Sequence, residues 1–232
     1  MEKMRGLILL MMPVLAVAQG GLPAAWQKAR DAQDRAALDG IAQAAAKEAE
    51  GKAGDAAALY RAALAESLRS EVAMEQRDKG AAGAAAQAGI RLAERAVAAK
   101  PGVGEYHRLL GTLCGQVIPA NVMLGLKYGR CALEEVNKAI ELEPKSAVAW
   151  MSRGVGNYYL PASFGGGADK AIVDFDKAAG LDPKNADIQV WRGIALRKLN
   201  RAGEARAAFE RSLKLNPARK WAKEQLEKTP AP

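Results

Sequence analysis

The stretch ADIQVWRGIALRKLNRAGEARAAFERSLKLNP, residues 186–217, decides how the rest of the chain is interpreted. Its apolar residues recur at helical spacing in two segments, the pattern of a helix, a turn and a second helix. Pro217 ends the second segment because proline cannot continue the helical hydrogen-bond ladder. Pro183 stands 34 residues before Pro217, so the unit has a defined period. The sequence therefore predicts a helical hairpin that is one member of a repeating array.

This unit resembles a tetratricopeptide repeat, in which two antiparallel helices cross closely. The resemblance is carried by Gly193, Ala205, Phe209, Ser212 and Pro217. Small residues are needed where the helices cross, and an aromatic ring fills the gap between them. Gln189 and Arg192 depart from the pattern, because they stand where Trp and Leu are usual. The resemblance implies an all-α fold, a right-handed helical-hairpin solenoid with enlarged loops inside its repeats.

Two further units precede this one, at residues 104–144 and 147–183, which gives three repeats with residues 186–217. The distance from Pro101 to Pro144 exceeds the 34-residue period by nine residues, and that from Pro144 to Pro183 by five. The extra residues fall at 116–124 and 160–167, in the turn within each hairpin. Both enlarged loops are therefore expected on the same edge of the stack. The second loop, LPASFGGG, excludes a regular helix.

The N-terminal part, residues 22–100, is Ala-rich and predicted to be helical. Counting back from Pro101 places Gly89, Ala93 and Ala96 at the signature positions of a degenerate repeat, although a plain helical hairpin has the same periodicity. Residues 79–83 break the helical pattern, so the last helix of this part is expected to begin at Ala84. At the other end, residues 218–228 are predicted to form a capping helix and residues 229–232 a disordered tail.

Residues 1–18 have the composition of a secretory signal peptide. Lys3 and Arg5 precede an apolar run at residues 7–15, and the small-residue sequence AVA follows at residues 16–18. We expect cleavage after Ala18 and a secreted or periplasmic protein, with no stable membrane insertion of the mature chain. The alternative is a retained membrane anchor, but the run is too short to span a bilayer and Pro13 interrupts it.

Composition and motifs point to binding rather than catalysis. The formal net charge is +8, but Lys and Arg are scattered among Asp and Glu along the helices, so a nucleic-acid partner is not expected. No nucleophile elbow, phosphate loop or metalloprotease spacing is present. His107, the single histidine, stands where the repeat prefers Trp. We therefore expect no enzymatic activity, no cofactor and no metal site.

Cys114 and Cys131 are the two cysteines of the chain. In the register of the resembled repeat they lie at the same height on facing antiparallel helices. We therefore expect a Cys114–Cys131 disulfide in an oxidising compartment. Two buried, unpaired thiols are the alternative in a reducing one.

The resemblance also implies which side chains face a partner, because in such arrays the first helix of each unit lines a concave groove. The implied residues are Arg108 and Thr112 in the first unit, Met151, Val155, Tyr158 and Tyr159 in the second, and Val190, Ile194 and Arg197 in the third. The centre of this groove is apolar and aromatic, which suits a peptide or helix that docks through an apolar anchor. Packing beneath the loop at residues 160–167 is a second interpretation of Tyr158 and Tyr159.

The function expected from these features is that of an exported, non-enzymatic scaffold that binds a protein or peptide in its groove. An envelope adapter or assembly factor, monomeric or weakly self-associating, fits this description. The alternative is a small-molecule or lipid carrier, with a pocket around Tyr158, Tyr159 and Phe164 closed by the loops at residues 116–124 and 160–167. A third possibility, an enzyme accessory domain, requires residues 1–18 to stay in the mature protein as a membrane tether.

Overall fold

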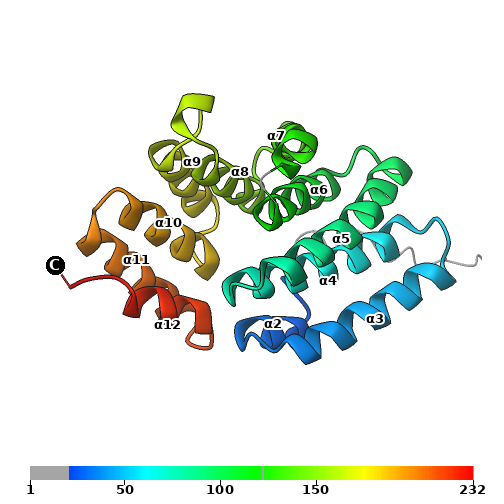
Figure 1. Cartoon of the computed structure of the whole chain (residues 1–232), viewed down its shortest axis with the longest axis horizontal. Coiled ribbons are helices and arrows are strands. Elements are labelled where there is room, and N and C mark those ends of the chain that lie inside the picture. The colour runs from blue at the N-terminus through cyan, green and yellow to red at the C-terminus, as the bar shows by residue number, and fades with distance from the viewer. Residues whose placement is uncertain (1–20, 122, 232) are drawn as a thin grey trace, which may run out of the picture.

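The computed structural model describes residues 21–121 and 123–231. These residues form eleven α-helices and two short 3-10 helices, without a β-strand. Successive α-helices pair as antiparallel hairpins that follow one another around an arc (Figure 1). The predicted signal segment, residues 1–18, lies outside the described residues.

The Ala-rich part supplies two hairpins, α2 (Ala24–Asp31) with α3 (Arg35–Gly51) and α4 (Ala56–Glu75) with α5 (Lys79–Ala99). Three more hairpins follow, α6 (Gly104–Val117) with α7 (Leu124–Leu142), α8 (Ala147–Tyr159) with α9 (Ala168–Leu181), and α10 (Ala186–Lys198) with α11 (Ala202–Leu215). Helix α12 (Lys220–Glu227) packs on α10 and α11. The 3-10 helices η1 (Ile118–Ala120) and η2 (Ala162–Phe164) lie in the turns of the third and fourth hairpins. The expected all-α solenoid with enlarged loops inside its repeats is confirmed.

Short polar side chains begin several of these helices. Asp34, Asp55, Asp78 and Ser146 each accept a hydrogen bond from a backbone N–H two or three residues further along. Asn185 does the same for α10. Each of these bonds satisfies a donor that the first turn of a helix leaves unpaired.

Helix α5 begins earlier than the sequence pattern indicated. With Asp78 as its N-cap the helix starts at Lys79, so the expected break at residues 79–83 is wrong. The glycine that suggested the break has a packing role, because a Cβ atom on Gly83 would lie 2.5 Å from the Cβ of Ala120 in η1. The loop of the third hairpin therefore rests on α5 at a place where only glycine fits.

Two helix crossings explain the small residues of the repeat pattern. A Cβ atom on Gly193 of α10 would lie 2.6 Å from Cε1 of Phe209 on α11, and both residues are buried. Gly154 of α8 stands in the same relation to Phe175 of α9, at 2.5 Å. The ring of the second helix thus occupies the space that a side chain on the first would need.

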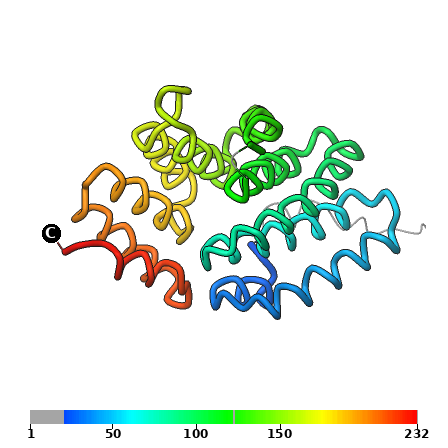
Figure 2. The backbone as a smooth tube through the Cα atoms, in the orientation of Figure 1, coloured from blue at the N-terminus to red at the C-terminus, as the bar shows by residue number. Residues whose placement is uncertain are grey.

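The two ends of the solenoid meet. Helix α12 lies beside α2 in Figures 1 and 2, and Arg219, just before α12, is completely buried there. Seven polar residues make the contact, and we call them the closure cluster: Arg30, Asp31, Glu71, Glu75, Asp187, Asn216 and Arg219. Arg219 pairs with Glu75, with Glu71 at 2.8 Å and with Asp187 at 3.2 Å.

Two other members extend the closure cluster to the N-terminal helices. Arg30 on α2 pairs with both Glu71 and Asp187, each at 2.7 Å. The Nδ2 of Asn216 donates a hydrogen bond to Asp31 at 2.8 Å. Residues 144 to 185 positions apart in the sequence are thereby joined, and the arc closes on itself.

The C-terminal tail differs from its prediction at Thr229. This residue is 2% exposed, and its hydroxyl donates to the carbonyl of Gln225 at 2.7 Å and accepts from Arg197 at 3.1 Å. Its own carbonyl accepts a hydrogen bond from Arg206 at 2.7 Å. Thr229 therefore belongs to the folded cap, because α10 and α11 both bond to it.

Candidate binding surface of the inner helices

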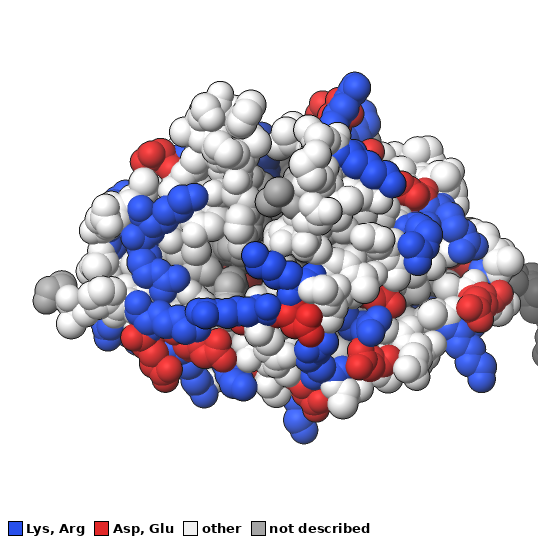
Figure 3. Space-filling model, viewed as in Figure 1, with Lys and Arg blue, Asp and Glu red and all other residues white. Residues whose placement is uncertain are grey.

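The first helices of the hairpins form an inner row. Helices α4, α6, α8, α10 and α12 contact one another in that order, and each second helix, from α5 to α11, packs on the first helix of its own hairpin. Figure 3 shows the molecule hollowed near the centre of this view, with Lys and Arg side chains along the border of the hollow. The residues expected to bind a partner all lie on α6, α8 and α10.

Arg108 and Thr112, two of the residues expected to face a partner, bond to each other on α6 within a network of internal bonds. Arg108 bonds through Nε to Glu105 at 2.7 Å and through Nη1 to Thr112 at 3.3 Å. Tyr60 donates to the same Glu105 at 2.8 Å, and Thr112 donates to Ser152 of α8 at 3.2 Å. Burial, together with the charge of Glu105, raises the pKa of Tyr60, so its hydroxyl stays protonated as a donor. The charge of Arg108 is therefore already neutralised at this end of the row.

Val190, Ile194 and Arg197 on α10 do not line an open surface, contrary to expectation. Val190 is completely buried and Ile194 is 6% exposed, in one apolar cluster with Ala222 of α12. Arg197 donates to the carbonyl of Gln225 at 3.1 Å and so holds the cap in place. The physical reason is that this face of α10 packs on the capping helix, while its first turn is engaged in the closure cluster through Asp187.

The last three helices of the row carry an aromatic surface. Tyr158 and Tyr159 of α8, Trp191 of α10 and Trp221 of α12 form a connected group, which we call the aromatic ladder. Ring centroids are 5.0 Å apart for the two tyrosines, 6.3 Å for Tyr158 and Trp191, and 5.2 Å for the two tryptophans. Tyr159 is 56% exposed, and the other three are half-buried. The ladder spans three successive inner helices.

Three neighbours complete the ladder. Met151 and Val155 are half-buried and pack on the same apolar cluster as Tyr158, Trp191 and Trp221. Lys198 donates to the carbonyl of Tyr158 at 3.0 Å and places its ammonium 4.3 Å from the centre of that ring. A cation over an aromatic face is attracted by the electron density of the ring. The ladder therefore has a positive edge.

Trp191 and Trp221 are the members of the ladder that the sequence reasoning missed. Trp191 immediately follows Val190, which the repeat register selects, and Trp221 lies in the segment expected to form the capping helix. Their residue type could have marked them as candidate binding residues, because Trp is enriched at binding surfaces.

Among the described residues, the loop at residues 160–167 does not cover Tyr159, which is 56% exposed. The loop at residues 160–167 folds on itself, with Gly167 donating to the carbonyl of Asn157 at 2.8 Å, and it leaves Phe164 76% exposed. A pocket of about 450 Å³ lies elsewhere, between α2, α3 and α4, lined by Trp26, Ala37, Gly40, Ile41, Ala44, Ala45, Glu48 and Arg61. The carrier alternative requires Phe164 to line a closed pocket with Tyr158 and Tyr159, whereas the side chain of Phe164 is largely exposed.

Cys114 and Cys131 form the expected disulfide, with their Cα atoms 6.0 Å apart. The bond joins α6 to α7, and Cys114 is completely buried. His107 has a structural position on the same hairpin, between Glu135 at 2.6 Å and the carbonyl of Pro101 at 2.8 Å. Across residues 21–121 and 123–231, no helix is long and apolar enough to cross a membrane, and no three His, Cys, Asp or Glu side chains are grouped to hold a metal ion.

Comparison with known proteins supports the fold. No family model and no curated protein matches the chain. Among solved structures, TTC0263, a thermophilic tetratricopeptide protein of Thermus thermophilus, is similar with a TM-score of 0.61 at 19% identity, over 83% of this chain and 92% of that chain. YrrB, described as having an unusual peptide-binding site, is similar with a TM-score of 0.46 at 18% identity, over 82% and 84%. MamA is similar with a TM-score of 0.45 at 20% identity, over 83% and 94%.

The likeness to TTC0263 agrees with the solenoid of helical hairpins described above. At this level of identity the likeness concerns the fold. The chain has a tetratricopeptide-like fold, a solenoid of helical hairpins.

Proposed function

We propose that this protein is an interaction scaffold that binds a protein or peptide on the aromatic ladder of its inner helices. The observation that carries the proposal is the ladder itself, four aromatic side chains on α8, α10 and α12 with Tyr159 56% exposed. Tyr and Trp are the residues that most often anchor protein interfaces. Within the described residues, neither tyrosine hydroxyl nor either indole N–H of the ladder makes a hydrogen bond, so all four donors are available to a partner.

The proposed mode of binding is an extended or helical segment laid along the ladder. Met151 and Val155 provide an apolar floor, and the rings provide anchor sites for apolar side chains. Lys198 at the edge favours a segment with acidic residues next to its apolar anchor. We propose binding without catalysis, because the charged groups on this row, such as Arg108 with Glu105, are paired with one another.

The proposal extends to location, with the protein acting outside the cytosol as an envelope adapter or assembly factor. Its support is the signal-like composition of residues 1–18 and the Cys114–Cys131 bond, a linkage that persists in oxidising compartments. The mature chain is proposed to be monomeric or weakly self-associating. A mass measurement on protein purified from the natural source should find Gln19 as the first residue, and a mass that includes residues 1–18 would contradict export with cleavage.

Site-specific photo-crosslinking in the producing cell tests the binding site. A photoreactive phenylalanine analogue replaces Tyr159 in one variant and Val173, 68% exposed on outer helix α9, in the matched control. We expect a discrete higher-mass adduct from position 159 and none from position 173, and the adduct should be lost when Trp221→Ala is added. Absence of an adduct at 159, or equal adducts at both positions, would contradict binding on the ladder.

A further inference from the structure

The residue six positions after the terminating proline of the preceding unit has a ring in two successive hairpins and lacks one in the last hairpin. His107 and Trp150 occupy this position on α6 and α8, and each bonds to the carbonyl of the proline six residues earlier, at 2.8 Å and 2.9 Å. Gln189 is the corresponding residue of α10, six residues after Pro183. It lacks a ring and makes no such bond. The space that a ring fills in the earlier units is therefore left to a smaller, polar side chain.

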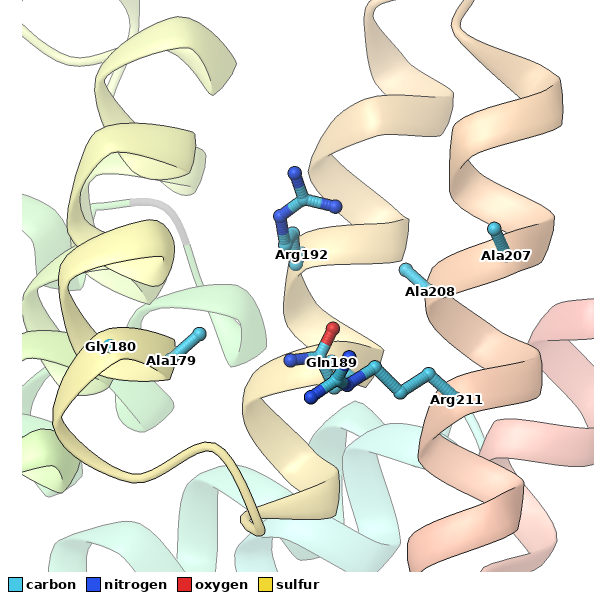
Figure 4. Close-up of a pocket in the computed structure, with 7 residues that line it drawn as sticks. All are labelled: Ala179, Gly180, Gln189, Arg192, Ala207, Ala208 and Arg211. Carbon is cyan, nitrogen blue, oxygen red and sulfur yellow. The ribbon is translucent and has the colours of Figure 1, made fainter.

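A pocket opens at this place. It has a volume of about 410 Å³ and is lined by Ala179, Gly180, Gln189, Arg192, Ala207, Ala208 and Arg211. In Figure 4 the small residues of α9 and α11 lie on either side of α10, and the side chain of Arg211 extends from α11 toward Gln189. A volume of this size is in the range of small-molecule sites. The wall is made of four residues without long side chains, so the polar groups are concentrated on Gln189, Arg192 and Arg211.

The polar groups in the pocket have unused hydrogen-bonding capacity. Gln189 is 6% exposed, and within the described residues its amide makes no hydrogen bond to the protein, but the amide lines the pocket and is not closed off from it. Arg211 is likewise without an ion pair in the part of the chain that the structure describes, whereas Arg192 uses its Nε on Asp176 at 2.6 Å. The amide of Gln189 and the guanidinium of Arg211 are therefore open to the oxygens of a ligand that enters the pocket. Amide and guanidinium N–H groups together match the oxygens of an anion.

The local charge also favours an anion. Residues 186–232 contain eleven Lys and Arg against five Asp and Glu, so most of the net charge of +8 belongs to this end of the chain. An excess of positive charge raises the local concentration of anionic ligands.

We propose that the pocket between α9, α10 and α11 is a binding site for an oxyanion, a carboxylate or phosphate group carried by a small ligand. Arg211 forms the charged pair with the oxyanion, Gln189 donates its amide N–H to it, and the free N–H groups of Arg192 close the third side. Four small wall residues accept the body of the ligand. The site is lined by residues other than the aromatic ladder, so it adds a second binding function to the scaffold.

Titration calorimetry on the full mature chain at low ionic strength, with succinate and with inorganic phosphate as separate probes, tests this site. We expect saturable binding of at least one probe, and the better probe identifies the carboxylate or phosphate source. Arg211→Gln should weaken binding by about tenfold or more, since a charge-assisted pair is lost. Gln189→Trp, which restores the ring of the repeat pattern and fills the pocket, should abolish it.

Lys214→Gln is the matched control, because it removes the same charge from an exposed position of the same helix, outside the pocket lining. Lys214→Gln should change the affinity for the probe by no more than about twofold, because a charge outside the pocket acts on the ligand only through a field that salt screens. Circular dichroism confirms that each variant is folded, and Arg211 is exposed, so its substitution leaves the core intact. No saturable binding of either probe, or an equal loss with Lys214→Gln, overturns the proposal.

Discussion

At the residue scale, glycines set the distance between paired helices. Gly193 and Phe209 were predicted to meet from their positions in the repeat pattern, and the structure places them in contact. Gly83 was misinterpreted as a helix break, because its partner Ala120 belongs to a loop 37 residues away whose path helical periodicity does not specify. Spacing along a helix therefore predicts contacts inside a repeat, but not contacts made by an inserted loop.

The crossing at Gly154 gives a direct test of this distance. Gly154→Ala places a methyl group 2.5 Å from the buried ring of Phe175, and we expect the free energy of unfolding to fall by about 1–3 kcal/mol in urea denaturation. The control is Gly156→Ala in the same helix, where a Cβ atom meets nothing within 4 Å. This change should stabilise the protein by about 0.5–1 kcal/mol, since alanine is the better helix former. Equal effects of the two substitutions would show that the crossing is not tightly packed.

At the element scale, the Cys114–Cys131 bond fixes the hairpin that carries the loop at residues 116–124. Its register was predictable because facing positions of antiparallel helices follow from the repeat pattern. The bond closes a loop with a sequence separation of 17 residues. In the chain-entropy model such a loop restricts the unfolded chain by about 3 kcal/mol.

Replacing both cysteines tests that contribution. The double variant Cys114→Ser with Cys131→Ser should lose about 2–4 kcal/mol of unfolding free energy relative to the oxidised protein. Addition of reductant to the wild type should give a loss of similar size, and reductant should not affect the double variant. An unchanged denaturation midpoint after reduction would contradict a stabilising role.

The candidate site was only partly predictable at this scale. Met151, Val155, Tyr158 and Tyr159 lie in or beneath the aromatic ladder because α8 follows the repeat register. The inner face of α10 follows the same register, yet Val190 is buried because α12 packs on it. The repeat register predicts on which face of its helix a residue lies. Whether that face is exposed depends on the packing of the next helix in the array.

At the scale of the whole molecule, the closure cluster has an unequal number of charges. Arg30 and Arg219 face the carboxylates of Asp31, Glu71, Glu75 and Asp187. Burial raises the pKa of Glu75 to about 7, against the lowering effect of Arg219. Burial disfavours the charged form of Asp187 as well, but Arg30 and Arg219 outweigh it and hold the pKa of that carboxyl below its usual range. The sequence alone did not predict the closure cluster. Whether the two ends of the solenoid meet depends on its curvature, to which every hairpin between them contributes.

The raised pKa of Glu75 predicts a pH dependence of stability. In the unfolded chain this carboxyl releases its proton near pH 4.5, whereas in the folded chain it keeps the proton to about pH 7. The free energy of unfolding should therefore fall by about 1–3 kcal/mol between pH 5 and pH 8. Asp187 does not contribute in this range, because its stabilising charge is lost only below its unfolded pKa of 3.8.

Urea denaturation at several pH values between 5 and 8 measures this decline. Glu75→Gln removes the titrating group and should flatten the profile, with the largest gain over wild type at pH 8. Glu210→Gln, an exposed carboxylate of α11, is the control and should keep the wild-type slope. A slope that survives Glu75→Gln would assign the titration to another group.

The bonds of Asn216 and Arg219 to α2 and α4 join the two ends of the array, and this changes how its repeats depend on one another. In an open solenoid each repeat interacts with its neighbours and the terminal units have one neighbour fewer, so units can be gained or lost one at a time. Here the first and last units are neighbours too, and the array has the periodic boundary of a ring. A duplication or deletion of one hairpin would separate Arg219 from Glu71 and Glu75 and leave buried charges unpaired. The number of hairpins is therefore fixed by the geometry of closure, and this scaffold changes its specificity through side chains and loops rather than through length.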